Sequence, residues 1–312
     1  MKRRLSISLA LMLCGAFLAG CSAEEPEVSL GSTLAESSQP AANAEQESEP
    51  AQSIQEEIQP ETSMSADNVS VSEEAPVVYM TTDISPEGLM AIYEALGAQL
   101  PEGNIAVKIS TGETGSNYLR PELIGGLVQA VDGTIVECNT AYGGERANTA
   151  YHMQLAEDHG YTAIADVDIM DADGSMTLPV TGGTHLTENY VGSHFENYDY
   201  FIVLSHFKGH AMAGFGGAIK NISIGMASSD GKAHIHSGGT GGSMWGGDQN
   251  AFLESMAEAG KSVADYMDGN MLYINVMNRL SVDCDCDGNP AEPDMHDIGS
   301  DFSKNLGRKE VF

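Results

Sequence analysis

Short apolar, β-rich runs alternate with amphipathic helical patterns along this chain from Val77 onward. This alternation is typical of βαβ units, in which helices connect parallel strands. It predicts an α/β fold, with a mostly parallel sheet and flanking helices in a single main domain. Tyr200–Leu204 is apolar at every position, so we expect this strand to lie deep in the sheet. The expected strands are 77–81, 105–109, 134–138, 163–169 and 200–204, and the expected helices are 85–96, 121–131 and 146–159.

The segment after the deepest strand, Ser205–Ser237, holds four of the nine histidines and three lysines. Open α/β sheets bind ligands beyond the carboxyl ends of their strands, so a ligand site is expected here. A glycine-rich loop precedes a helical pattern at 218–226, and backbone N–H groups at such a helix start can bind an anion. The glycine spacing matches neither a P-loop nor a dinucleotide fingerprint. The residues expected to bind a cofactor or anion are Gly214, Gly216, Gly217 and Lys220.

The histidines of this segment have both a functional and a structural interpretation. His206 and His210 are four apart and would share one face of a helix as metal ligands, although Gly209 disfavours a helix there. Alternatively, both rings bind carbonyls in a turn. His234 and His236 have the spacing of two residues on one side of a strand. One by one these histidines fit structural roles, but their gathering with a lysine favours a site.

A second cluster, SVDCDCDGNPAEPD from Ser281 to Asp294, follows the apolar run 271–277. If that strand continues, Cys284 and Cys286 project to the same face. Two thiolates, with carboxylates or His296, would bind zinc or iron. An ordinary acidic loop and a bridge between the two cysteines are the alternatives.

The N-terminus has the pattern of an export signal, with Lys2, Arg3 and Arg4 before an apolar stretch. That stretch, Leu5–Leu18, is 14 residues long, shorter than the roughly 20 that span a membrane. Leu18-Ala19-Gly20-Cys21 resembles the lipobox of bacterial lipoproteins. The resemblance implies a signal peptide over 1–20 and lipidation of Cys21, with membrane lipid as the partner and an extracytoplasmic, membrane-anchored location.

Residues 21–76 have the composition of a disordered acidic tether, because few large apolar residues interrupt their Ser, Glu, Gln, Ala and Pro. Positions 22–76 contain 13 Asp and Glu and no Lys or Arg. The whole chain carries a formal net charge of −31, which argues against nucleic acid as a partner.

The motifs HFKGHAMAGFGGAIKN, SIGMASSDGK and NRLSVDCDCDGNPAEPDMHDIG resemble the domain-of-unknown-function 362 family, whose members are often described as uncharacterised iron–sulfur centre proteins. The resemblance covers residues 77–299. Many members carry closely spaced cysteines that hold four-iron clusters. This chain has no such run, so no ferredoxin-type cluster is expected. Residues 300–312 depart from the family, and we interpret them as a poorly packed tail of a truncated or frameshifted chain.

A stretch of this sequence is also similar to lactate racemases, which use a nickel-pincer nucleotide. It consists of Gly214-Phe215-Gly216-Gly217 before Lys220, with His210 ten residues before that lysine and His236 sixteen after it. The resemblance implies that Lys220 bonds a cofactor or substrate, that His236 ligates a metal and that His210 is a general acid or base. No counterpart of the racemases' further catalytic histidine is found in the first half of the chain.

Two functions remain open at this point. The first is a membrane-tethered, metal-assisted enzyme that acts on a small anionic substrate, with nickel, zinc or iron as the metal. The second is a non-catalytic lipoprotein that binds a metal or anion, or an inactive, truncated family member. The expected catalytic residues are His210 and Lys220, and the expected metal ligands are His206, His236, Cys284 and Cys286.

Overall fold

The computed structural model describes residues 77–281, 284, 286 and 299–304. Contacts divide the chain into two units, Met1–Val69 and Ser70–Phe312, and every described residue belongs to the second. The expected signal peptide, Cys21 and the acidic tether lie outside the described residues, as does His296. Within the described part of the chain, no helix has the length and apolar character needed to cross a bilayer.

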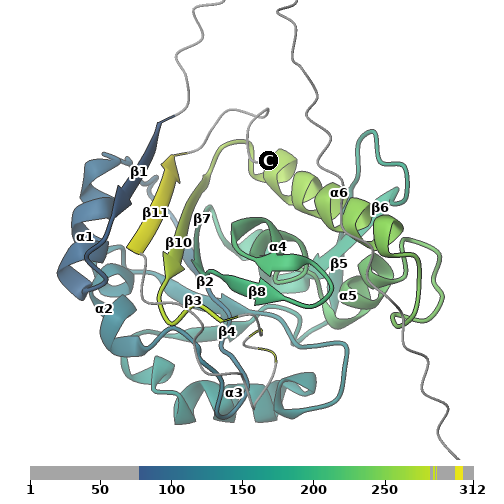
Figure 1. Cartoon of the computed structure of the whole chain (residues 1–312), viewed down its shortest axis with the longest axis horizontal. Coiled ribbons are helices and arrows are strands. Elements are labelled where there is room, and N and C mark those ends of the chain that lie inside the picture. Colours follow the sequence, from purple (N-terminus) through teal and green to yellow (C-terminus); the bar gives the residue numbers. More distant parts are fainter. Residues whose placement is uncertain (1–76, 282–283, 285, 287–298, 305–312) are drawn as a thin grey trace, which may run out of the picture. The chain divides into compact units, whose positions relative to one another are not determined.

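A seven-stranded sheet forms the centre of the fold, in the order β1-β11-β10-β7-β2-β3-β4 (Figure 1). Neighbouring strands from β10 to β4 pair in parallel, whereas β11 is antiparallel to both β10 and β1. The mostly parallel α/β sheet predicted from the sequence is therefore confirmed. The strands are β1 (Val78–Thr81), β2 (Ile105–Lys108), β3 (Thr134–Glu137), β4 (Val167–Ile169), β7 (Tyr200–His206), β10 (Met271–Met277) and β11 (Gly299–Lys304).

Two hairpins and three short 3-10 helices lie outside this sheet. The hairpins are β5 (Ser175–Pro179) with β6 (Glu188–Gly192), and β8 (Lys208–His210) with β9 (Gly214–Gly216). The 3-10 helices are η1 (Glu145–Ala147), η2 (Tyr161–Ala163) and η3 (Ser193–Asn197).

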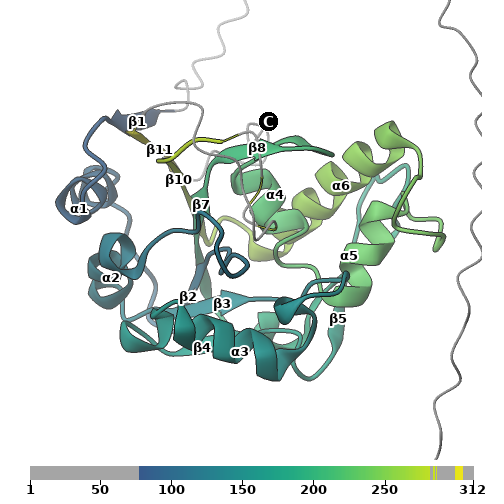
Figure 2. The ribbon, with the colours of Figure 1, turned by 60° about the horizontal axis from the view of Figure 1, so that its bottom comes forward.

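Helices cover both faces of the sheet, so the fold has three layers (Figures 1 and 2). One apolar core joins α1, α2 and α3 to the sheet, and a second joins α4 and α6 to the opposite face. A third, smaller core lies between α5 and α6. The helices are α1 (Pro86–Ala95), α2 (Pro121–Ala130), α3 (Thr149–Asp158), α4 (Ala218–Ser223), α5 (Ser229–His236) and α6 (Gln249–Met267).

Strand β7 lies in the middle of the sheet, as its sequence predicted. Ile202 and Leu204 pack in the core beneath α1 and α2, while Phe201 and Val203 pack in the core beneath α4 and α6. All four side chains have no exposed surface. A strand with apolar residues at every position can thus fill two cores at once, because alternate side chains point to opposite faces.

The structure corrects three expectations. His234 and His236 lie in a helix, α5, because Ser228 caps its start by accepting a hydrogen bond from the Gly231 N–H. Of the expected tail 300–312, residues 300–304 are part of β11, which pairs with both β1 and β10, and residues 305–312 lie outside the described residues. The 19-residue helix α6 was not predicted.

A buried ion pair joins the carboxyl ends of β2 and β3. The Lys108 ammonium donates to the Glu137 carboxylate at 2.8 Å, to the Ile109 carbonyl at 2.6 Å and to the Asn221 side chain at 2.9 Å. Lys108 has no exposed surface and Glu137 is 3 % exposed. Since Asn221 belongs to α4, this network joins two strands to the helix above them.

We expect Lys108→Met to destabilise the protein by about 3–5 kcal/mol, because it leaves a buried carboxylate without its main partner. Lys261→Met is the control, since Lys261 is half exposed and pairs with Asp265 on α6. The control should cost less than about 1 kcal/mol. Urea denaturation measures both, and equal losses would contradict a structural role for the buried pair.

Stability should also fall in acid through Glu137. Burial alone would raise the pKa of this carboxyl, but the charges of Lys108 and Arg146 outweigh it and lower the pKa from 4.5 to about 2. A carboxyl whose pKa is lowered by folding stabilises the fold at any pH above its pKa in the unfolded chain. This contribution is lost as the pH falls from about 4.5 toward about 2. In Glu137→Gln the free energy of unfolding should vary less with pH across this window, and an unchanged slope would contradict the assignment.

Candidate functional site

A cavity of about 100 Å³ opens beyond the carboxyl ends of β2, β3 and β7. The last residues of these strands, Lys108, Glu137 and His206, all line it. The chain runs outward through β2, β3 and β4 and then returns to place β7 on the other side of β2. Open α/β sheets bind ligands where the strand order reverses in this way. The cavity therefore lies where the sequence analysis expected a ligand site.

The lining of this cavity is strongly basic although the domain is acidic. Residues 77–299 contain 30 Asp and Glu but only eight Lys and Arg. Five of these eight cations line the cavity, whereas Glu137 is the one carboxylate among the described lining residues. A buried concentration of positive charge favours anionic ligands. The five cations are Lys108, Arg146, Lys208, Lys220 and Lys232.

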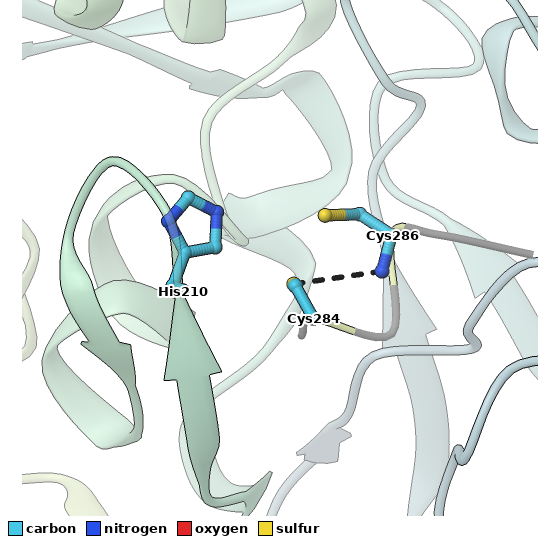
Figure 3. Close-up of side chains that lie close together, drawn as sticks. All are labelled: His210, Cys284 and Cys286. Atoms are coloured by element: carbon cyan, nitrogen blue, oxygen red, sulfur yellow. Dashed lines mark hydrogen bonds between the residues drawn. The ribbon is translucent and has the colours of Figure 1, made fainter. Parts of the chain in front are cut away.

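His210, Cys284 and Cys286 come together at the same cavity (Figure 3). Each offers one ligand atom, and these atoms lie within 4.8 Å of one another. His210 ends β8, and the cysteines follow β10 at some distance, since that strand ends at Met277. The condition that the strand continues to the cysteines is thus not met, because residues 278–281 already lie outside β10. Both thiols are free, so no bridge joins them.

The two thiols have opposite acidities. A hydrogen bond with Cys286 lowers the pKa of Cys284 well below its ordinary value, and the charges of Lys220 and Lys208 and a hydrogen bond from His210 add to this effect against burial. The same hydrogen bond and burial raise the pKa of Cys286. The Cys286 backbone N–H also donates to the Cys284 sulfur at 3.5 Å. Cys284 is therefore the thiolate of the pair, and a thiolate is both a metal ligand and a nucleophile.

Backbone hydrogen bonds fix the His210 ring. Its Nδ1 accepts from the Met212 N–H at 3.2 Å and from the Ala213 N–H at 3.0 Å. In a neutral ring the proton therefore lies on Nε2, which allows the donation to Cys284.

The other two expected histidine ligands are held by carbonyl groups. Nε2 of the buried His206 lies 2.8 Å from the Asn278 carbonyl, and this ring is not part of the trio formed by His210, Cys284 and Cys286. Nδ1 of His236 lies 2.7 Å from the Lys232 carbonyl, and its ring stacks on Phe252. Burial lowers the pKa of His236, so the neutral ring presents an unprotonated Nε2. Both residues line the cavity, but only His236 has an arrangement suited to a base.

Two of the three expected glycines shape the cavity, together with Lys220. A Cβ atom on Gly216 would lie 3.4 Å from the Lys220 side chain, and one on Gly217 would lie 2.9 Å from the Phe207 ring. Both glycines line the cavity, whereas Gly214, the first residue of β9, does not. The expected anion site at the start of α4 is partly used, because the Ala218 N–H donates to the Asn275 side chain at 3.0 Å.

The sequence analysis missed five charged lining residues, namely Lys108, Glu137, Arg146, Lys208 and Lys232. One signal was present, because Lys108 and Glu137 each end an apolar strand at the edge where ligands bind. Arg146 is buried and donates to Glu113 at 2.8 Å and to the Tyr142 hydroxyl at 3.0 Å.

Comparison with solved structures finds similarity at low sequence identity. The lactate racemase apoprotein of Thermoanaerobacterium thermosaccharolyticum is 16% identical with a TM-score of 0.41, over 65% of this chain and 50% of that chain. A Thermotoga maritima protein from a structural genomics consortium is 11% identical with a TM-score of 0.42, over 72% of this chain and 55% of that chain. The chain thus spans about half of each structure. No curated protein matches this sequence.

A family model does match. The model described as Domain of unknown function (DUF362) covers residues 105–305, which is more than half of the chain and includes every strand that lines the cavity. The chain therefore belongs to the DUF362 family.

Proposed function

We propose that the cavity binds a small anionic molecule beside a divalent metal ion, and that the metal acts on this molecule as a Lewis acid. His210, Cys284 and Cys286 would hold the metal. The observation that carries the proposal is the convergence of five of eight cationic side chains on the cavity that contains this trio. Charge of this kind attracts an anion, and the trio supplies a place for the ion that would polarise it.

The donor set suits zinc or iron. Two thiolates and one imidazole, with a fourth position left for water or substrate, form one of the known arrangements of catalytic zinc. Ligand atoms of a tetrahedral zinc ion lie roughly 3.5–3.8 Å apart, given bond lengths of about 2.0–2.3 Å. Because the atoms of the trio already lie within 4.8 Å of one another, small side-chain movements would complete the site. Thiolates disfavour magnesium and calcium, which prefer oxygen.

Metal binding would require a proton to leave Nε2 of His210. Nδ1 accepts two backbone hydrogen bonds, so the neutral ring carries its proton on Nε2. A metal at Nε2 would displace that proton to Nδ1 and turn the Met212 and Ala213 N–H groups away. We therefore expect loading to shift the proton within the His210 ring, to release a proton from the Cys286 thiol and to depend on pH.

The cations and His236 would serve the anion. Lys220 and Lys232 would neutralise its charge, and the unprotonated Nε2 of His236 would accept a proton from it. Only interactions that strengthen in the transition state would accelerate a reaction.

Thiolate chemistry is a second candidate function. The hydrogen bond between His210 and Cys284, with Lys220 and Lys208 nearby, is the arrangement of an activated nucleophile. The proton on Nε2 favours this candidate, since a metal ligand would need that nitrogen free.

Cobalt binding separates the two candidates. We expect the purified protein to take up one equivalent of Co²⁺ and to show thiolate-to-cobalt charge-transfer absorption, with zinc, iron or nickel competing for the site. Cys284→Ser and Cys286→Ser should each weaken binding by at least roughly tenfold, because each removes a thiolate ligand.

Cys138→Ser is the matched control for this experiment. Cys138 lines the same cavity but is not part of the trio, and burial raises its pKa to about 12. It should bind cobalt like the unchanged protein. A protein that binds no cobalt, but whose Cys284 is alkylated rapidly at neutral pH, would overturn the metal proposal and support thiolate chemistry.

We further propose that this site operates outside the cytoplasmic membrane, tethered through Cys21. The support is the lipobox-like sequence and the segment that follows it, which is acidic and contains few large apolar residues. Cys21→Ser should move the protein from the membrane fraction to the soluble fraction, because acyl chains provide the anchor. Cys14→Ser, within the apolar part of the signal, should leave it in the membrane fraction. Equal membrane association of both variants would refute the lipid anchor.

A further inference from the structure

The cavity limits the size of its ligand. Its volume of about 100 Å³ is smaller than the roughly 150 Å³ of a protein cavity that holds benzene. An occupant therefore has few non-hydrogen atoms inside the protein. The charge of this small occupant follows from four of the five cations, since Lys208 already interacts within the protein.

Two of the cations are already neutralised by protein groups. Lys108 has three N–H donors, and Ile109, Glu137 and Asn221 accept from all three. Arg146 donates to Glu113 at 2.8 Å and lies 3.9 Å from the Glu137 carboxylate. These two side chains form the floor of the cavity and balance the charges of Glu113 and Glu137.

Lys220 and Lys232 have no such balance. Across the described residues, no carboxylate pairs with either ammonium group. Lys232 is 7 % exposed, and among the described residues its ammonium donates to the Ala227 carbonyl alone, at 2.5 Å, which leaves two N–H donors. The Lys220 ammonium makes no hydrogen bond to any described residue. Both side chains line the cavity, so their remaining donors are available to a ligand there.

A buried ammonium without a counter-charge is costly, and the expected compensation is a bound anion. Burial lowers the pKa of Lys232, and an anion beside it would stabilise its charged form. The thiolates are not the missing counter-charge when a divalent metal is bound, because two thiolates and a divalent ion sum to zero.

We propose that the ligand of this cavity is a small oxyanion with two negative charges, bound between Lys220 and Lys232. This inference rests on the proposed function, since the metal must neutralise the thiolates. A dicarboxylate and a phosphate or sulfate group share the required chemistry. A monoanion would leave one lysine uncompensated and should bind more weakly.

Matched pairs of anions test the charge directly. Sulfate and methanesulfonate have a similar size and shape but carry two charges and one, and malonate and malonamate form a second such pair, a dicarboxylate and its monoamide. Titration of the cobalt-loaded protein by calorimetry gives the affinities. Fluorescence of Trp245, the single tryptophan of the chain, gives a second readout because its ring lies 6.4 Å from His236 in the cavity wall.

In at least one pair we expect the dianion to bind tighter by roughly tenfold or more, because it forms one further charge-assisted hydrogen bond. The pair that shows the preference identifies the source, sulfate-like or dicarboxylate. In Lys232→Gln the preference should shrink to less than about threefold. Lys220→Gln is a second, less buried variant that should do the same if Lys232→Gln does not fold. Lys261→Gln, on the exposed face of α6, should keep the full preference.

The outcomes separate this inference from the proposed function. Equal affinities within both pairs, with cobalt bound, would overturn the dianion and leave the metal and anion site intact. A preference that persists in both lysine variants would overturn the roles of Lys220 and Lys232. Failure to bind cobalt or any of the four anions would overturn the proposed function itself.

Discussion

The buried pair of Lys108 and Glu137 is the interaction on which the site depends. Neither charge could remain at the carboxyl edge of the sheet alone, because an unpaired buried charge costs several kcal/mol. Together they complete a network that continues through Asn221 to the Ser205 hydroxyl, at 3.0 Å, and so reaches β7. A Cβ atom at Gly225 would lie 2.9 Å from the Lys108 nitrogen, so this glycine leaves the room that the pair requires. Three strands and α4 are thereby fixed relative to one another at the floor of the cavity.

The same network explains how an acidic domain maintains a basic cavity. Glu137 accepts from Lys108 and lies close to Arg146, so its single carboxylate stabilises two cations. Lys220 and Lys232 enter from helices α4 and α5 instead, above that floor. The cavity thus combines two cations that carboxylates already neutralise, at its floor, with further cations in its walls. This arrangement is suited to selective binding, because the floor is already satisfied and a ligand interacts with the walls.

The fold was predictable because its signal is local, whereas much of the site was not. Tyr200–Leu204 specifies a buried strand in five residues, and the position of the ligand site follows from where that strand ends. Lys220, His210 and His236 were found because they lie in one segment. Lys108 and Asn221 are 113 residues apart, and only the fold brings them together. The sequence analysis placed Cys284 and Cys286 together because alternate residues of a strand share a face. That reason does not apply, since β10 ends at Met277. A strand was an alternative for His234 and His236, because a spacing of two places side chains on one face of a strand, but both residues lie in α5.

The position of the trio suggests that metal binding and local structure are coupled. His210 belongs to the hairpin β8–β9, and Cys284 and Cys286 follow β10, yet the Gly209 N–H already donates to the Ser281 carbonyl at 2.7 Å. Before Gly209 in the same segment, the Phe207 N–H donates to the Val276 carbonyl of β10 at 2.9 Å. Two backbone hydrogen bonds therefore align these segments before any ion binds. An ion would add a third connection farther along, and its binding energy would contribute to holding the cysteine segment against the hairpin. Because the hairpin also presents Gly216 between the side chains of Lys208 and Lys220, ordering of the metal site would position the cationic wall of the cavity as well.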